Sequence, residues 1–310
     1  MPLLRLALAV ALLSVAAPAS AVTIDWVTIG GPGNAADTTG FGAVANAYRI
    51  SATEVTHAQY VEFLNAVAAS DTNGLYNTNM GSSSHGGITR SGSAGSYSYA
   101  TQSGAADLPV NFVSFWDALR FANWMHNGQT TNPASTEDGA YTITAQGIAD
   151  NTITRNGGAS IFLTSEDEWY KAAYWDPVSA GYFDYPIGSD TQTLCSVLTL
   201  PDAANCNNAV GTTTDVGAYV LSASPNGTFD QAGNVIEWNE AIISGSVRGI
   251  RGGDWFTSPA NQAAGFRASS DPSVEISTLG FRVASPIPEP GSALLVAAGL
   301  LALAARRRSP

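Results

Sequence analysis

The sequence predicts a mixed α+β domain with many loops. Three segments place apolar residues at helical spacing behind an N-terminal cap, and several short segments have the alternating or β-branched character of strands. The second half is rich in Gly, Asn and Thr, and only local order can be recognised there. About 265 residues between the two terminal segments suffice for one large domain with a sizeable core.

The first predicted elements are two short strands and a helix. Residues 26–29 and 48–55 are strand candidates on either side of a Gly-rich loop. Thr56 and Gln59 have the spacing of a capping box, in which each side chain bonds the backbone N–H of the other residue. The apolar residues that follow recur at i, i+3, i+4 and i+7, as on one face of a helix: Tyr60, Phe63, Leu64 and Val67.

Residues 71–107 are expected to form a long surface loop or insertion. They are dominated by Gly, Ser, Asn and Thr and hold too few large apolar residues to form a core of their own. After them, Ser114 with Asp117 three residues later predicts the start of a second helix, which Asn127-Gly128 ends.

The middle of the chain predicts a hairpin and a third helix. Residues 139–144 and 153–162 have the alternating character of two hairpin strands around a polar turn. Ser165 and Glu168 form another capping box, and the helix that they open should end at Asp176-Pro177.

Residues 1–21 have the features of a secretory signal peptide. Arg5 supplies the basic start, residues 6–15 form the apolar run, and Ala19-Ser20-Ala21 is a small-residue cleavage site. The mature domain should therefore begin at Val22, and the chain should leave the cytoplasm. The alternative is a buried N-terminal helix.

The C-terminal segment, residues 286–310, contains Pro288, Glu289 and Pro290, an apolar run over 291–305 and a basic triplet. A helix of about 15 residues is roughly 22 Å long, short of a bilayer core of about 30 Å. The order of these features resembles the PEP-CTERM sorting signal of Gram-negative bacteria. The resemblance implies a transient transmembrane segment, an exosortase-type protease as partner, and a final location at the cell surface or outside the cell. A plain membrane anchor is the alternative.

Composition argues against several functions. The formal net charge is −12, and without Arg5 and the three terminal arginines 9 basic residues face 25 acidic ones, so nucleic acid is not expected as a partner. The three histidines have no metal-ligand spacing: His57, His85 and His126. No P-loop, nucleophile elbow, dinucleotide-binding glycine motif or C-x-x-C pair occurs, so phosphoryl, acyl and hydride transfer have no support.

The only cysteines, Cys195 and Cys206, are 11 positions apart. In an exported chain a disulfide between them can persist, and closing so short a loop would stabilise the fold by about 3 kcal/mol. A local disulfide is the prediction, and two free thiols are the alternative.

Sequence strings over nearly all of residues 22–284 resemble, in order, those of the formylglycine-generating enzyme (sulfatase-modifying factor) family. The clearest are residues 229–238 (FDQAGNVIEW), Arg251-Gly252-Gly253-Asp254-Trp255 and Gly280-Phe281-Arg282-Val283. The resemblance implies a domain over residues 22–285 with a C-type-lectin-like fold of the formylglycine-generating type. Such a domain has two main helices, short antiparallel strands, and calcium as structural cement.

Asp230, Gly233, Val235 and Glu237 are the predicted calcium ligands. Calcium takes six to eight oxygen ligands and mixes carboxylates with backbone carbonyls. Asp230 and Glu237 would supply carboxylates, and Gly233 would aim its own carbonyl and that of Val235; the matching positions bind calcium in the family. The alternative is a Gly-Asn turn with solvated acids. Asn205 marks a candidate second calcium loop, without the acidic residues expected after it.

The copper-binding cysteine pair of active family members is missing here. Their thiols follow the Arg-Gly-Gly-Ser-Trp-like string, whereas residues 255–267 contain no cysteine. Asp254 replaces the serine, and Thr257 or Ser258 stands where the first thiol is expected. Because soft sulfur ligands select Cu(I), copper is not expected as a cofactor.

Three arginines recur beside glycine or aromatic residues: Arg251, Arg267 and Arg282. They are predicted to pair with carboxylates and to organise loops. The alternative is that they, with Asp254 and Trp255, line the family's substrate groove and clamp an anion or a peptide.

The sequence thus favours an exported, cell-surface or matrix-associated protein. Its calcium-stabilised domain would be a binding or structural module, with a peptide or an exopolysaccharide as ligand. An active oxidoreductase of the family with an unrecognised metal site is the alternative, and a passive structural coat protein is the third hypothesis.

Overall fold

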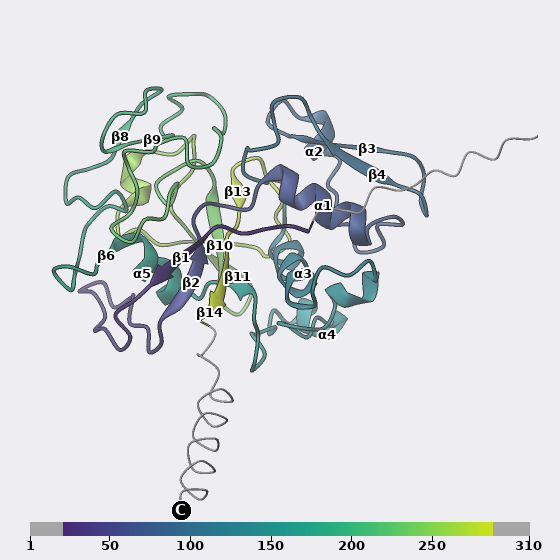
Figure 1. Cartoon of the computed structure of the whole chain (residues 1–310), viewed down its shortest axis with the longest axis horizontal. Helices are drawn as coiled ribbons and strands as arrows, with labels where there is room; N and C mark the ends of the chain where they lie inside the picture. The colour runs from purple at the N-terminus through teal and green to yellow at the C-terminus, as the bar shows by residue number, and fades with distance from the viewer. Residues whose placement is uncertain (1–20, 288–310) are drawn as a thin grey trace, which may run out of the picture.

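The computed structural model describes residues 21–287, which form an α+β fold (Figure 1). The predicted fold class is confirmed, including the large share of loops and the short strands. The predicted signal peptide up to residue 20, and the sorting residues Pro288, Glu289 and Pro290 with the apolar run after them, lie outside the described residues. Between residues 21 and 287, no helix is long and apolar enough to cross a bilayer.

One sheet joins the two ends of the domain. Its strand order is β1 (Trp26–Ile29), β2 (Tyr48–Ser51), β14 (Val283–Pro286) and β5 (Phe162–Leu163), and every neighbouring pair is antiparallel. The last strand therefore lies between strands from the beginning and the middle of the chain, as the yellow β14 beside the purple β2 shows in Figure 1.

The two main helices, α1 (His57–Val67) and α3 (Phe115–His126), begin at the predicted caps Thr56 and Ser114, and both capping boxes are complete. An aromatic cluster with ring centroids 5.3–6.2 Å apart joins the two helices to the loop before β14. Its members are Tyr60, Phe63, Phe121, Trp124 and Phe281. This cluster is the centre of the main hydrophobic core.

A second sheet carries the predicted site. Its order is β12 (Ala268–Ser270), β11 (Val247–Arg251), β10 (Ile236–Ser244) and β13 (Leu279–Gly280). The β10–β13 pair is parallel and the other two pairs are antiparallel. Helix α5 (Glu166–Tyr174) begins at Ser165 as predicted and ends before β6 (Trp175–Asp176), which pairs with β7 (Gly181–Tyr182).

Two local predictions were confirmed only in part. The presumed surface loop over residues 71–107 contains the helix α2 (Asn79–Ser82) and a hairpin of β3 (Ile88–Ser91) and β4 (Ser98–Thr101). Its Tyr99 is buried and bonds to the backbone at the end of α1, so this insertion packs on the core. The predicted hairpin strands, 139–144 and 153–162, pair only at one antiparallel bridge, between Tyr141 and Arg155. The helix α4 (Ala145–Ala149), capped by Thr144, replaces the polar turn expected between them.

The remaining elements are short. They are the 3-10 helices η1 (Pro133–Thr136) and η2 (Pro259–Gln262) and the parallel pair β8 (Leu194–Cys195) and β9 (Ala203–Ala204). The fold thus places β10, the turn before it and the loop after β11 beside α5.

Candidate functional site

The predicted calcium ligand Glu237 forms a buried ion pair. Glu237 lies on β10, and both it and Arg282 are fully buried. Arg282 Nε lies 2.6 Å from Glu237 Oε2, Arg282 Nη2 lies 2.8 Å from Oε1, and Trp169 Nε1 on α5 donates to Oε2 at 2.8 Å. The remaining guanidinium hydrogens reach carbonyl oxygens of Ser51 and Phe229. Arg282 thus ties β10 to the start and end of the domain.

Two more buried carboxyl groups lie around the same arginine. Asp230 accepts a hydrogen bond from the Gly217 backbone at 2.5 Å, and Glu54 accepts one from the Asn234 amide at 3.2 Å. Burial raises the pKa of Asp230 to about 6, and burial together with the charge of Asp230 holds the pKa of Glu54 well above its usual range. We call these three carboxyl groups and Arg282 the acidic cluster.

The turn between Asp230 and β10 is built for close backbone contact. Gly233 has φ +88°, and a Cβ there would lie 2.2 Å from the carbonyl oxygen of Asn205. Asn234 follows at φ +59° and donates its backbone N–H to that carbonyl at 2.9 Å. Val235 is fully buried. Asn205, predicted to mark a second calcium loop, therefore lies directly against the first predicted site.

The donor set fits a divalent cation in its charge but is not a preformed cage. Across residues 21–287, no three His, Cys, Asp or Glu side chains are arranged to hold a metal ion. Glu54 Oε2 and Asn205 Oδ1 are nevertheless buried without a hydrogen-bond partner, and three carboxyl groups face one guanidinium. Calcium held partly by backbone carbonyls would relieve both deficits.

The loop after β11 is closed by Asp254. Its Oδ1 accepts hydrogen bonds from the backbone N–H groups of Phe256 and Thr257 at 2.9 and 2.8 Å. The Thr257 hydroxyl oxygen accepts from the Asp254 backbone at 2.9 Å. Trp255 is buried and stacks on His85 with centroids 4.9 Å apart. The segment that carries thiols in active relatives is thus a self-bonded polar turn here.

Arg251 and Arg267 share one acid. Arg251 Nε lies 2.9 Å and Arg267 Nε 2.8 Å from Glu166 Oε1 on α5. Arg251 is buried and its guanidinium lies over the rings of Phe41 and Tyr170, whereas the Arg267 side chain is 38% exposed. We call Glu166, Arg251 and Arg267 the basic cluster.

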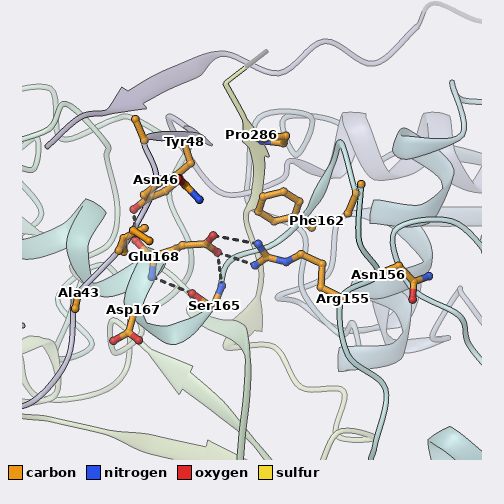
Figure 2. A pocket seen from close by; sticks show the side chains of 15 residues that line it. Ala43, Asn46, Tyr48, Arg155, Asn156, Phe162, Ser165, Asp167, Glu168 and Pro286 are labelled. Atoms are coloured by element: carbon orange, nitrogen blue, oxygen red, sulfur yellow. Dashed lines mark hydrogen bonds and ion pairs between the residues drawn. The ribbon is translucent and has the colours of Figure 1, made fainter. Parts of the chain in front are cut away.

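A fourth arginine, Arg155, lines a pocket with a volume of about 380 Å³ (Figure 2). Arg155 pairs with Glu168 at 2.7 Å and with Glu240 at 2.6 Å, and it lies over the Phe162 ring. Pro286, the end of β14, forms part of the pocket wall. None of the predicted site residues lines this pocket.

Cys195 and Cys206 are joined in a disulfide that links β8 to the segment after β9. Since the chain has only these two cysteines, no thiol remains free.

Sequence reasoning missed two acids of these clusters. Glu54 belongs to the predicted strand over residues 48–55, and Glu166 follows Ser165 at the start of the predicted third helix. Neither position by itself indicates a site. In the structure Glu168 completes the capping box, whereas Glu166 turns to the arginines. A sequence signal existed only for Glu166, as an acid at the first helical position.

Comparisons with known proteins agree with this architecture. The model of the sulfatase-modifying factor enzyme 1-like domain matches residues 34–287, and that of the PEP-CTERM protein-sorting motif matches residues 286–308. The motif marks the chain for export to the surface or exterior through exosortase-type processing.

Among curated proteins, hercynine oxygenase of Mycobacterium tuberculosis is 25% identical over 181 residues, which is 52% of this chain. The match spans about a third of that relative's length, 33%. Among solved structures, CarF has a TM-score of 0.56 at 24% identity and covers 86% of this chain and 99% of its own. Treponema denticola variable protein 1 has a TM-score of 0.54 at 20% identity and covers 84% and 95%. Given the family match over most of its length, the chain belongs to the sulfatase-modifying factor (formylglycine-generating enzyme) family.

Proposed function

We propose that this exported protein is a binding module that uses the family's fold for recognition instead of copper-dependent oxidation. One observation carries the proposal: both cysteines are joined in a disulfide at β8, and the loop after β11 offers hydroxyl and carboxylate groups in place of thiols. Soft sulfur ligands select Cu(I), and this loop has none. Its ligand would be a peptide or an exopolysaccharide, the polymers that an exported surface protein meets.

We also propose that calcium stabilises the domain at Asp230, Gly233, Val235 and Glu237, with Glu54 as an additional acid beside them. The excess of buried carboxyl groups and the unpartnered Glu54 Oε2 support a divalent cation there. Because Glu237 is already bonded to Arg282 and Trp169, the carboxylate that it would supply to the ion is shared with these two side chains.

The binding role is tested on the purified exported protein in three assays. Metal analysis, oxygen uptake with cysteine-containing peptides, and saturable binding on peptide and glycan arrays together separate the hypotheses. We expect no stoichiometric copper, no oxygen uptake, and at least one saturable ligand. Stoichiometric redox metal with turnover would establish the second candidate, an active oxidoreductase, which the oxygenase relative favours. Absence of any saturable ligand would leave a structural coat protein.

The calcium proposal is tested by thermal unfolding with calcium or with a chelator. The wild type should melt at a higher temperature in calcium, by an amount that grows with concentration because the ion binds only the folded state. Asp230→Asn should lose most of this gain, whereas Asp215→Asn, at an exposed aspartate, should keep it. An equal response of both variants would reject the site.

A further inference from the structure

Exposed large apolar side chains gather on two neighbouring loops. In residues 21–287, eleven large hydrophobic residues remain exposed, and six of them lie in β8, in the loop after it and in the segment 220–221. We call these six the apolar ridge; their exposed fractions are 43–64%: Leu194, Val197, Leu198, Leu200, Val220 and Leu221. Isolated exposed apolar residues are ordinary, but a contiguous group is typical of an interaction surface.

The ridge is one fixed surface. The Tyr219 hydroxyl donates to the Ser196 carbonyl at 2.6 Å, and the Ser222 hydroxyl donates to the Leu200 carbonyl at 3.3 Å, so the two loops are bonded to each other. The β8–β9 pair and the Cys195–Cys206 disulfide anchor the longer loop at its base (Figure 1). A surface that is already ordered loses little conformational entropy when a partner covers it.

The ridge also carries no charge, which is unusual in this acidic chain. Residues 191–201 and 216–229 contain no Asp, Glu, Lys or Arg, although the whole chain has a net charge of −12. The first charge beyond them is the exposed Asp202, whose carbonyl accepts from the Leu194 N–H at the base of the longer loop. Two copies of the chain repel each other over most of their surfaces, but at the ridge only this carboxylate at its edge opposes their contact.

Charge and area together favour a second copy as the occupant. An anionic membrane is a poor match, because the loops offer no Lys or Arg and the chain is acidic overall. Half-exposed Val and Leu residues each present on the order of 100 Å², so the ridge presents roughly 500–600 Å². Two ridges face to face would bury about 1,000–1,200 Å², the lower end of specific interfaces.

We propose that the apolar ridge joins two copies of this protein in a symmetric dimer. A two-fold axis brings the same patch of both subunits together, so the apolar side chains of one ridge would meet those of the other. The dimer should be weak, with a Kd of about 1–100 µM, and salt should strengthen it by screening the like net charges. This inference is independent of the ligand and of calcium.

Sedimentation velocity on the mature exported protein tests the dimer over a concentration range that brackets this Kd. The wild type should shift from monomer to dimer, and Leu198→Asp should raise the Kd at least tenfold by placing two carboxylates at the interface. Val220→Asp, on the other loop, should do the same. Val178→Asp is the matched control, since Val178 is 93% exposed but lies outside the ridge, and it should associate like the wild type.

Each outcome bears on the proposal. A wild type that stays monomeric throughout, or a Val178→Asp variant as disruptive as Leu198→Asp, would overturn it. Association through a retained C-terminal segment would not respond to Leu198→Asp, because that segment is identical in all variants. Co-sedimentation with phosphatidylcholine or phosphatidylglycerol vesicles that Leu198→Asp abolishes would show a membrane as the occupant and reject the dimer. Circular dichroism checks that each variant is folded.

Discussion

The acidic cluster and the basic cluster both lie beside the second sheet, but acids are in excess in the first and arginines in the second. In the acidic cluster three buried carboxyl groups face one arginine, whereas in the basic cluster one carboxylate faces two arginines. Both link a segment of the first sheet or α5 to the loops around β10 and β11.

The two imbalances are relieved differently. In the basic cluster Arg267 reaches solvent, and Arg251 lies over aromatic rings and donates to the Phe266 carbonyl at 2.7 Å. The buried Arg251 Nη2 has no hydrogen-bond partner, but it lies 2.7 Å from Glu166 Oε1 as an ion pair. The excess of carboxyl groups in the acidic cluster is not relieved in this way, because Glu54 and Asp230 are buried and their pKa values are raised. The difference teaches that an excess of buried arginine can be satisfied by carbonyls and rings, whereas an excess of carboxyl groups requires protons or a cation.

Removing the arginine of the acidic cluster should have the largest effect. Arg282→Met leaves three carboxyl groups buried without their counter-charge, so the free energy of unfolding should fall by about 3–5 kcal/mol. Denaturant unfolding in a chelating buffer measures it. Arg267→Met, which removes a partly exposed arginine and leaves Arg251 with Glu166, should cost about 1 kcal/mol. Equal losses would show that the two clusters do not differ as described.

Removing the acid of the basic cluster should cost less. Glu166→Gln leaves Arg251 buried without an anion and should lower the free energy of unfolding by about 2–4 kcal/mol. The loss should be the same in calcium and in chelator, since no excess of acids exists at that cluster. Glu62→Gln on α1, at a half-buried position, should change stability by less than about 0.5 kcal/mol. A calcium-dependent loss for Glu166→Gln would contradict the separation of the clusters.

Much of the fold followed from local sequence, because the capping residues Thr56, Ser114 and Ser165 act within one helical turn. Of the hairpin over 139–162 only one bridge forms, because the segment between its two strands contains a helix capped by Thr144, a local signal that the alternating pattern obscured. The acidic cluster unites residues 54, 230, 237 and 282, and only Asp230 and Glu237 are close enough in sequence to suggest a common site. Glu54 joins them through tertiary packing, which no local pattern shows.

The pH dependence of stability tests the acidic cluster further. Burial raises the pKa of Asp230 to about 6 in the folded protein, above its unfolded value. The folded state therefore binds the Asp230 proton more tightly than the unfolded state does. The resulting contribution to the free energy of unfolding is full below about pH 4 and is lost as the pH rises through 6. In chelator, the free energy of unfolding of Asp230→Asn relative to that of the wild type should rise by about 2–3 kcal/mol between pH 4 and pH 7. Asp215→Asn corrects for a lost surface charge, and saturating calcium should remove the gain.

The smallest difference concerns the turn that brings the acidic cluster against Asn205. Gly233 and Gly227 have nearly the same φ, +88° and +91°, but a Cβ at Gly233 would lie 2.2 Å from the Asn205 carbonyl, whereas nothing lies within 4 Å of one at Gly227. Gly227→Ala should therefore cost only conformational strain, about 1 kcal/mol. Gly233→Ala should lower the free energy of unfolding by about 1–2 kcal/mol more, because the backbone at Asn205 must move. It should also reduce the rise in melting temperature that calcium produces. Chemical unfolding of the two variants side by side measures the difference. If they lose the same amount, contact with Asn205 does not position the turn, and the acids and Arg282 alone hold it.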